Sequence, residues 1–197
     1  IDDADAAFEI VSTAMQNGKD VVSASKKMIA EHLTELLELQ QQTGQSFLYE
    51  PAACASIPVI RNLEEYYDND LLHSIRAIVN GSTNFILTKI FEEGLDFRQA
   101  LVQAQQLGFA ESDPMLDVEG FDAVNKWTFL LTHAYGIVTT PENILFNGIQ
   151  NIQAGDAEVA AARKQEIKLV AQAQKLRDNK VAAFVLPQFV NHDDHLA

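Results

Sequence analysis

Hydrophobic positions alternate along the chain between helical spacing and short continuous runs. Helical patterns cover residues 5–17 and 28–42, and apolar runs that indicate buried strands lie at 21–22 and 46–50. Helix, strand, helix, strand in this order is typical of the βαβ units of a parallel sheet. The pattern therefore predicts part of a parallel α/β sheet, followed by a further helix over residues 59–67.

Beyond residue 67 the pattern predicts helices mixed with strands that pair in antiparallel fashion. Pro187, within the last of these strands, lacks a backbone N–H and suits a sheet edge. The polar residues 66–70 mark an expected boundary between a first domain at 1–67 and a second at 68–197. Helices are predicted at 85–93, 96–107, from 121 onward and at 158–177, and strands at 71–79, 144–149 and 181–190.

Composition and charge exclude several classes of protein. The 197 residues are 47% hydrophobic, which supports a buried core, and no apolar run approaches the ~18 residues of a membrane span. A net charge of −14 argues against nucleic acid or an anionic membrane as the partner. A single cysteine, Cys54, excludes an internal disulfide and suits the reducing cytoplasm. The acidic start does not match a signal peptide, and both ends are expected to be cut from a longer protein.

An acid-rich stretch over residues 108–131 is the main candidate for chemistry. Five carboxylates precede one cation, Lys126. At 100° per residue, Asp122 and Lys126 share one stripe of a helix, whereas Asp117 can join them only from a preceding turn. Acids in a first helical turn also complement the helix dipole, so composition alone favours a capped amphipathic helix. The five acids are Glu111, Asp113, Asp117, Glu119 and Asp122.

Metal binding is a weaker alternative at two places. The acidic stretch offers oxygen ligands for Mg²⁺ or Ca²⁺, but it lacks the EF-hand spacing, and Lys126 disfavours a dication. His192 and His195 beside two aspartates resemble a metal tract without a partner cluster, so metal binding is not expected there. The turn at 80–84 precedes a helix with Ser82 or Thr83 as the expected N-cap, and offers N–H groups to an anion or a carbonyl.

Three ordered segments resemble the homoserine dehydrogenase family. Residues 80–87, NGSTNFIL, resemble its N-G-T-T-N-Y/F-I-L, and residues 107–114, LGFAESDP, resemble its L-G-Y/F-A-E-x-D-P. Residues 117–126, DVEGFDAVNK, resemble its D-x-x-G-x-D-x-x-x-K. The resemblance extends weakly to V-T-A-N-K at residues 22–26, to E-x-x-V-x-G-G-x-P at 50–58 and to H-P-L-A at the end of the chain.

The resemblance implies an α/β fold, in which the C-terminal part of a Rossmann-like parallel sheet precedes an α+β catalytic and dimerisation domain. It also implies a homodimer that interconverts L-aspartate 4-semialdehyde and L-homoserine with NADP or NAD, in threonine and methionine biosynthesis. Lys126 matches the acid/base of the family. An ammonium there can protonate the alkoxide left by hydride transfer, and the amino-acid substrate's own ammonium requires carboxylates.

Other site residues follow from the same resemblance. Ser25 stands where the family usually has Asn, and Ala55 and Ser56 stand where it usually has glycines. The resemblance implies substrate binding by Glu111, Asp117 and Asp122; cofactor binding by Ser23, Lys26, Asn80, Gly81 and Gly108; and a monovalent-cation site, sodium in the family, at Glu50 with backbone at Ala53, Ala55 and Ile57.

Two functions of other classes stay open beside the enzyme. The chain could be a dimerisation scaffold without activity of its own, or the acidic cluster could serve a metal-dependent hydrolase. No G-x-G-x-x-G occurs, so the phosphate-binding half of a dinucleotide fold is missing and the fragment alone is expected to be inactive. The sequence decides neither between NAD and NADP nor whether an aspartate kinase or regulatory domain is fused outside this window.

Overall fold

The computed structural model describes residues 1, 3–67 and 72–197, which form two units. The first comprises Ile1–His73 with Asn125–Ile144, and the second comprises Ser74–Val124 with Leu145–Ala197. The expected domain boundary at 66–70 falls largely outside the described residues. The boundary between the units falls within helix α8 (Phe121–Tyr135), between Val124 and Asn125.

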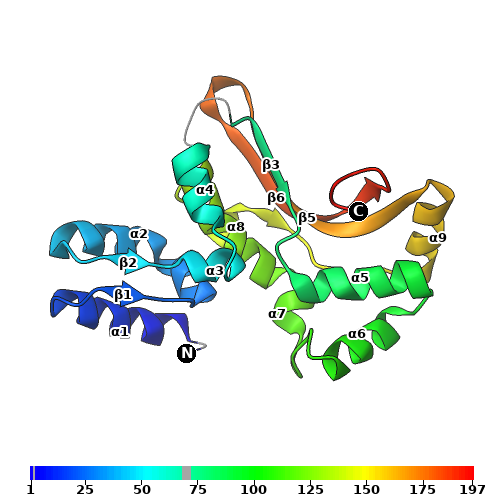
Figure 1. The fold of residues 1–197 in the computed structure, drawn as a ribbon, viewed down its shortest axis with the longest axis horizontal. Coiled ribbons are helices and arrows are strands. Elements are labelled where there is room, and N and C mark those ends of the chain that lie inside the picture. Colours follow the sequence, from blue (N-terminus) through cyan, green and yellow to red (C-terminus); the bar gives the residue numbers. More distant parts are fainter. Residues whose placement is uncertain (2, 68–71) are drawn as a thin grey trace. The chain divides into compact units, whose positions relative to one another are not determined.

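The first unit is built on a two-stranded parallel sheet. In this sheet β1 pairs with β2 through Val21↔Phe47 and Val22↔Leu48, as the βαβ pattern predicted. Figure 1 shows α1 and α2 beside these strands. The elements are α1 (Ala4–Gln16), β1 (Val21–Val22), α2 (Lys26–Thr43), β2 (Phe47–Leu48), α3 (Glu50–Cys54), α4 (Val59–Tyr66), most of α8 and the 3-10 helix η1 (Pro141–Asn143).

Local sequence explains the helices of the first unit. The carboxylate of Asp3 accepts a hydrogen bond from the N–H of Ala6 and caps α1, whose buried residues recur at intervals of three and four. Helix α2 ends at Gly44, which adopts the left-handed conformation with φ 68°. Helix α1 packs along α2 and also contacts β1.

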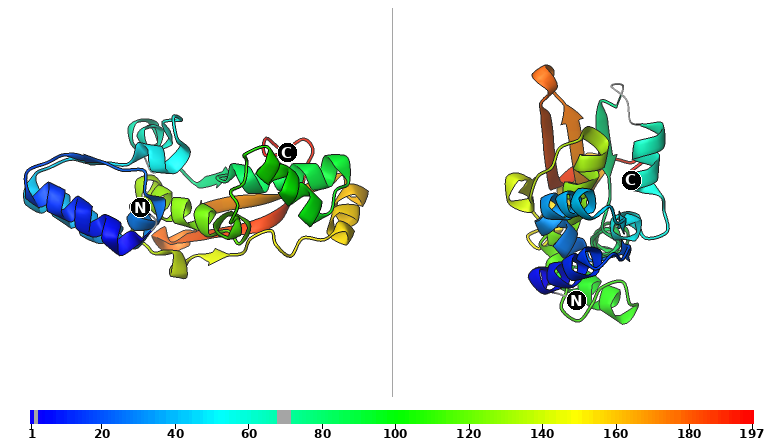
Figure 2. Two further views of the ribbon diagram at one scale, coloured as in Figure 1. Left: turned by 90° about the horizontal axis from the view of Figure 1, so that it is seen from below. Right: turned by 90° about the vertical axis from the view of Figure 1, so that its left-hand side faces the viewer.

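The second unit is built on a mixed four-stranded sheet in the order β3-β5-β6-β4. Strand β5 pairs antiparallel with β3 and β6, and β4 pairs parallel with β6. Figure 2 shows the long hairpin of β5 and β6, and α5 packs on both β5 and α6. The elements are β3 (Ser74–Ala77), α5 (Gly81–Glu93), α6 (Phe97–Gln106), α7 (Met115–Val118), the start of α8, β4 (Leu145–Phe146), α9 (Ala154–Ala162), β5 (Gln165–Lys175), the 3-10 helix η2 (Arg177–Asn179) and β6 (Val181–Asn191).

The secondary structure of one segment was predicted wrongly. The pattern indicated a helix over residues 158–177, but α9 ends at Ala162 and β5 begins at Gln165. Lys164 makes the break, because its φ of 56° lies in the left-handed region. The apolar residues that follow also fit a spacing of two, and eleven register pairs with β6 stabilise the strand. Such pairing overrides the helical propensity of the segment.

Smaller corrections concern boundaries. The N-cap of α5 is Asn80, not Ser82 or Thr83. Strand β6 lies between β5 and β4, so Pro187 is not on an edge strand, although β4 pairs only with Phe184 and Val185. The strands predicted at 71–79 and 144–149 shorten to β3 and β4, and residue 71 lies outside the described residues.

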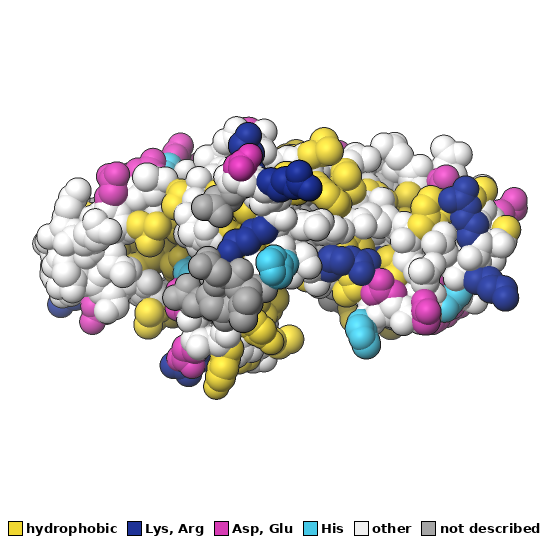
Figure 3. Space-filling view, turned by 90° about the horizontal axis from the view of Figure 1, so that it is seen from above, with side chains coloured by type: hydrophobic (Ala, Val, Ile, Leu, Met, Phe, Trp, Pro, Cys, Tyr) yellow, Lys and Arg dark blue, Asp and Glu magenta, His cyan; other side chains and the backbone are white. Residues whose placement is uncertain are grey.

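The fold class is nevertheless confirmed, because a parallel sheet is followed by a mixed α/β unit. Within the described part of the chain, no helix combines the length and apolar character needed to cross a membrane. On the face drawn in Figure 3, acidic and basic side chains are interspersed with hydrophobic ones.

Candidate active site

Asn80 links two of the predicted substrate-binding acids in the second unit. Its amide nitrogen donates hydrogen bonds to Oδ1 of Asp117 at 2.7 Å and to Oδ2 of Asp122 at 2.9 Å. Its amide oxygen accepts from the backbone N–H of Thr83 at 2.8 Å and from the Thr83 hydroxyl at 2.9 Å. The side chain that caps α5 therefore also holds two carboxylates together.

The turn between α7 and α8 positions these carboxylates. Asp117 lies in α7, and Asp122 lies in the first turn of α8. Between them Gly120 adopts φ 91°, a conformation that favours glycine. The turn packs against Gly148, where an added Cβ would lie 1.9 Å from the carbonyl oxygen of Val118. Asp117 thus joins Asp122 from a preceding turn, as its phase predicted, while the role of Gly148 was missed.

Gly108 and Glu111 lie in the loop that follows α6. Gly108 adopts φ 77° and ends that helix, as predicted. The Ser82 hydroxyl donates to the carbonyl oxygen of Phe109 at 2.7 Å, and the rings of Phe85 and Phe109 stack at 4.3 Å. The loop is therefore attached to the first turn of α5, where Gly81 is the first helical residue. The Glu111 side chain itself is exposed.

Lys126 lies on α8, four residues after Asp122, so helical periodicity puts both on one stripe of that helix. Within the first unit it lies in electrostatic range of Cys54. Burial raises the pKa of the Cys54 thiol, the positive charge of Lys126 lowers it, and the negative charge of Glu50 raises it. The next residue, Trp127, is 1% exposed, so this part of α8 is anchored in the core.

The predicted cation-site segment forms α3 and a tight turn. The two carboxylate oxygens of Glu50 accept the backbone N–H groups of Ile60 at 2.9 Å and Arg61 at 3.2 Å, and so cap α4, which begins after Pro58. Ala55 follows α3 with φ 52° and ψ −112°, values that strain a residue with a side chain. Ala53 is buried and Ile57 is exposed.

The predicted cofactor residues Ser23 and Lys26 lie where β1 leads into α2. The Ser23 hydroxyl accepts from the N–H of Ser25 at 3.2 Å, and Lys26 is the first residue of α2. The N-cap Ser25 makes no side-chain capping bond, so the first N–H groups of this 18-residue helix have no side-chain cap from that residue. This is the carboxyl edge of a parallel strand, where ligands of α/β sheets bind.

A chain of hydrogen bonds in the first unit, from Tyr49 through His133 to the exposed Glu64, was not predicted from the sequence. The Tyr49 hydroxyl lies 2.7 Å from Nε2 of His133, and Nδ1 of His133 lies 2.7 Å from Oε1 of Glu64. Because a carboxylate only accepts, Nδ1 carries a proton and donates it to Glu64, while Nε2 and the Tyr49 hydroxyl share the second hydrogen bond. The chain joins the end of β2 to α4 and α8. The available signal was the position of His133, two helical turns after Lys126.

No three His, Cys, Asp or Glu side chains among the described residues are placed to hold a metal ion. In the C-terminal tract, Asp194 accepts from the guanidinium of Arg76 at 2.8 Å, and His192 lies 3.5 Å from Glu166. In the acidic stretch, the Asn80 amide nitrogen donates to both Asp117 and Asp122.

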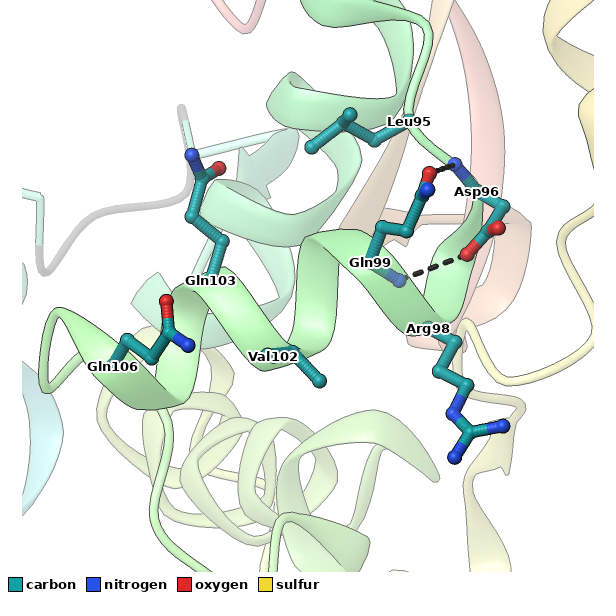
Figure 4. Close-up of a pocket in the computed structure, with 7 residues that line it drawn as sticks. All are labelled: Leu95, Asp96, Arg98, Gln99, Val102, Gln103 and Gln106. Carbon is teal, nitrogen blue, oxygen red and sulfur yellow. Dashed lines mark hydrogen bonds between the residues drawn. The ribbon is translucent and has the colours of Figure 1, made fainter.

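A hollow of about 430 Å³ lies on α6, and none of the residues that line it is a predicted site residue. Figure 4 shows Asp96 and Gln99 bonded to each other there, because they form the capping box of that helix. Their polar groups therefore serve the helix. The hollow is lined by Leu95, Asp96, Arg98, Gln99, Val102, Gln103 and Gln106.

Comparisons with known proteins agree with the motifs. A family model described as homoserine dehydrogenase matches residues 58–197, and one described as homoserine dehydrogenase, NAD binding domain, matches residues 4–50. The homoserine dehydrogenase of Lactococcus lactis is 35% identical over 187 residues, covering 95% of this chain and 44% of the relative. That of Corynebacterium glutamicum is 37% identical over 172 residues, covering 87% and 39%.

Solved structures show the same likeness. The homoserine dehydrogenase from Thiobacillus denitrificans matches with a TM-score of 0.91 and 33% identity, covering 96% of this chain and 44% of that one. A hyperthermophilic archaeal homoserine dehydrogenase mutant in complex with NADPH matches with a TM-score of 0.75 and 32% identity, covering 96% and 54%. The chain spans less than half the length of the curated relatives named above. Because the family model covers residues 58–197, well over half of the chain, the chain belongs to the homoserine dehydrogenase family.

Proposed function

We propose that the full-length protein interconverts L-homoserine and L-aspartate 4-semialdehyde with NAD or NADP, in threonine and methionine biosynthesis. The observation that carries the proposal is the bridge from Asn80 to Asp117 and Asp122. It holds two carboxylates in the motif that ends at Lys126, in a chain of the homoserine dehydrogenase family. An amino-acid substrate and a proton transfer require this combination of acids and a lysine.

In the proposed site, three acids bind the substrate's ammonium group. Asp117 and Asp122 are both half-buried and share one hydrogen-bond donor, so each keeps further lone pairs for an ammonium. Glu111, on the loop attached to α5, is the third acid. The carboxylates do not react. They orient the amino acid so that its carbonyl or hydroxyl carbon faces the cofactor.

Lys126 is the proposed acid/base. When bound, a nicotinamide dinucleotide supplies the hydride to the aldehyde carbon, or takes it from homoserine in the reverse direction. The aldehyde oxygen gains negative charge as the carbon is reduced, and the Lys126 ammonium stabilises this charge and donates its proton. In the direction of oxidation, neutral Lys126 accepts the hydroxyl proton. Solvent then restores the starting protonation state.

The residues at the start of α2 fit a dinucleotide. The end of β1 leads directly into this helix, whose N-cap residue leaves the first N–H groups without a side-chain cap, and Lys26 adds a positive charge. We assign Ser23, Lys26, Asn80, Gly81 and Gly108 to cofactor binding, with Asn80 contributing through its backbone. A related archaeal homoserine dehydrogenase has been solved in complex with NADPH, which supports a nicotinamide nucleotide in this chain as well.

We also propose a monovalent cation, sodium in the family, at the segment from Glu50 to Ile57. The oxygen atoms available there suit a hard cation. Although the Glu50 carboxylate accepts two N–H groups, a carboxylate retains further lone pairs. The carbonyl groups of Ala53, Ala55 and Ile57 would complete the ligand set.

Three further features complete the proposed function. We propose a cytoplasmic homodimer, with the cofactor-binding part at 1–67 and the catalytic and dimerisation part at 68–197. The single cysteine, a free thiol half-buried in the structure, supports a reducing compartment. A small-molecule substrate agrees with the net charge of −14, which repels nucleic acid and anionic membranes.

Steady-state kinetics of the full-length protein test the proposal. The wild type should oxidise L-homoserine with NAD⁺ or NADP⁺, and Lys126→Ala should lower kcat by roughly 10²–10⁴-fold because the proton donor is lost. Lys126→Arg keeps the charge but releases no proton at neutral pH, so it should stay close to Lys126→Ala. Lys89→Ala, in a lysine that pairs with Glu93 on α5, is the matched control and should keep wild-type activity.

The possible outcomes test the proposed reaction and the role of Lys126 separately. A wild type without turnover on homoserine with either nucleotide would overturn the proposed reaction. Near-normal turnover of Lys126→Ala, with the wild type active, would remove Lys126 from the chemical step. Circular dichroism checks that each variant is folded.

A further inference from the structure

The side-chain amide of Asn80 makes all of its hydrogen bonds within the protein. It is 5% exposed, and its amide makes four hydrogen bonds, which is the full capacity of that group. Two of them, accepted by the amide oxygen, serve Thr83 and the start of α5. The other two, donated by the amide nitrogen, go to Asp117 and Asp122. No ligand contact is needed to explain the burial of this amide.

The surroundings determine the orientation of the amide. The Thr83 backbone N–H can only donate, so the group that faces it at 2.8 Å must be the amide oxygen. The amide nitrogen then faces the two carboxylates, which accept from it at 2.7 and 2.9 Å. A flipped amide would put a donor against a donor, and an oxygen against two carboxylates. The observed bridge is therefore the only orientation that satisfies every group.

We propose that Asn80 is a positioning residue that holds Asp117 and Asp122 as one binding unit for the ammonium group of the amino-acid substrate. The inference rests on the proposed function and goes beyond it, since the family motif implied only cofactor binding for this residue. Two oxygens that accept from the same NH₂ group lie on the order of 5 Å apart. Two carboxylates at that separation repel each other, and the shared donor offsets the repulsion while keeping both oxygens directed to one place.

The N-cap and the bridge are separate functions of one side chain, so substitution can divide them. Asn80→Asp keeps an oxygen for the Thr83 N–H, since aspartate is as good an N-cap as asparagine. It replaces the shared donor with a third negative charge. Asn80→Ser also keeps a capping oxygen, and it replaces the two-donor NH₂ group with a single hydroxyl that cannot bridge both acids, without adding charge. Both variants should leave α5 intact and release the two acids.

Kinetics of the full-length enzyme test the inference. Asn80→Asp should raise the KM for homoserine by about 10–100-fold, because hydrogen bonds to charged groups are lost, and leave the KM for the nucleotide near wild type. Lowering the pH should recover part of the loss, since a protonated carboxyl group can again donate a hydrogen bond. Asn80→Ser should show a smaller rise without this pH-dependent recovery. A purely structural N-cap would produce neither the selective KM change nor the altered pH profile.

Helix α6 provides the matched control. Its N-cap Asp96 makes a capping box with Gln99, so Asp96→Ala removes a cap without touching the acids. This variant should lower the urea midpoint of unfolding and leave the KM for homoserine unchanged. If Asn80→Asp and Asn80→Ser keep the wild-type KM and pH profile, Asn80 is an N-cap only and the inference is wrong. A wild type that turns over no homoserine would instead overturn the proposed function. The failure of the inference and the failure of the proposed function therefore give different results.

Discussion

The turn after α3 predicts that Ala55→Gly stabilises the protein. The Ile57 N–H donates to the carbonyl oxygen of Cys54 at 3.0 Å, and Ala55 in between has φ 52° and ψ −112°. These are the angles of the first central position of a type II′ turn, which glycine dominates because it has no Cβ. The chain has alanine at this position, so its backbone is strained.

The magnitude follows from three contributions. Holding a residue with a side chain in a sparsely populated backbone region costs about 1–3 kcal/mol, which glycine avoids. Glycine loses more backbone entropy on folding, which costs about 0.5–1 kcal/mol relative to alanine. Because Ala55 is exposed, its methyl group contributes little burial. The net expectation is about 0.5–2 kcal/mol of added stability.

Equilibrium unfolding in urea measures this effect. Trp127 is the only tryptophan and is buried, so its fluorescence reports the loss of its surroundings on unfolding. With a slope near 2–3 kcal/mol per molar urea, the midpoint should rise by roughly 0.2–1 M at unchanged slope. Ala52→Gly is the matched control, since Ala52 lies within α3, and there the same change should cost about 1 kcal/mol or more. A midpoint of Ala55→Gly at or below wild type would refute the assigned strain.

Two further substitutions test other parts of the structure. Burial, and secondarily the charge of Glu64, raises the pKa of Tyr49, so the folded protein keeps the phenol neutral while the unfolded chain ionises it above about pH 10. The stabilisation from Tyr49 is thus complete below pH 10 and falls by up to about 1.4 kcal/mol per pH unit above it. Burial also raises the pKa of Tyr135, so the loss in urea midpoints should be smaller in Tyr49→Phe than in wild type. Gly148→Ala should cost about 1–3 kcal/mol and raise the KM for homoserine, because the new methyl group meets the carbonyl oxygen of Val118. Gly155→Ala, in an open position of α9, should be neutral or slightly stabilising, and an equal loss in both variants would contradict the packing argument.

Features with a strong local signal could be predicted from the sequence. Asp96 and Gln99 three residues later predict the start of α6, and Gly94 and Gly108 predict helix ends, because caps and left-handed glycines act within one turn. The parallel pairing of β1 and β2 followed from the alternation of helix and strand. Features that depend on distant partners could not be predicted in this way. Strand β5 consists of residues that also form helices, and its pairing with β6 decides the structure.

The candidate site likewise combines features that the local sequence predicts with features that depend on distant partners. Its residue types and their spacing predicted an acid group beside Lys126, but no local pattern assigns the Asn80 amide to two acids that lie 37 and 42 residues away. Likewise, the Tyr49 hydroxyl meets His133 across 84 residues. Side-chain hydrogen bonds of this range depend on the packed fold, which the linear pattern does not contain.

The spacing of the acids in the family motif has a physical explanation in this structure. On one continuous helix, Asp117 and Asp122 would differ by five residues, or about 140° around the axis, and would point in different directions. Gly120 interrupts the helix with its φ of 91°, and the turn fits closely against Gly148. The break lets two acids from successive helices reach the same amide nitrogen. The glycine in D-x-x-G-x-D is therefore required by the geometry of the acid pair. The Asn80 amide then bridges the two acids by donating a hydrogen bond to each.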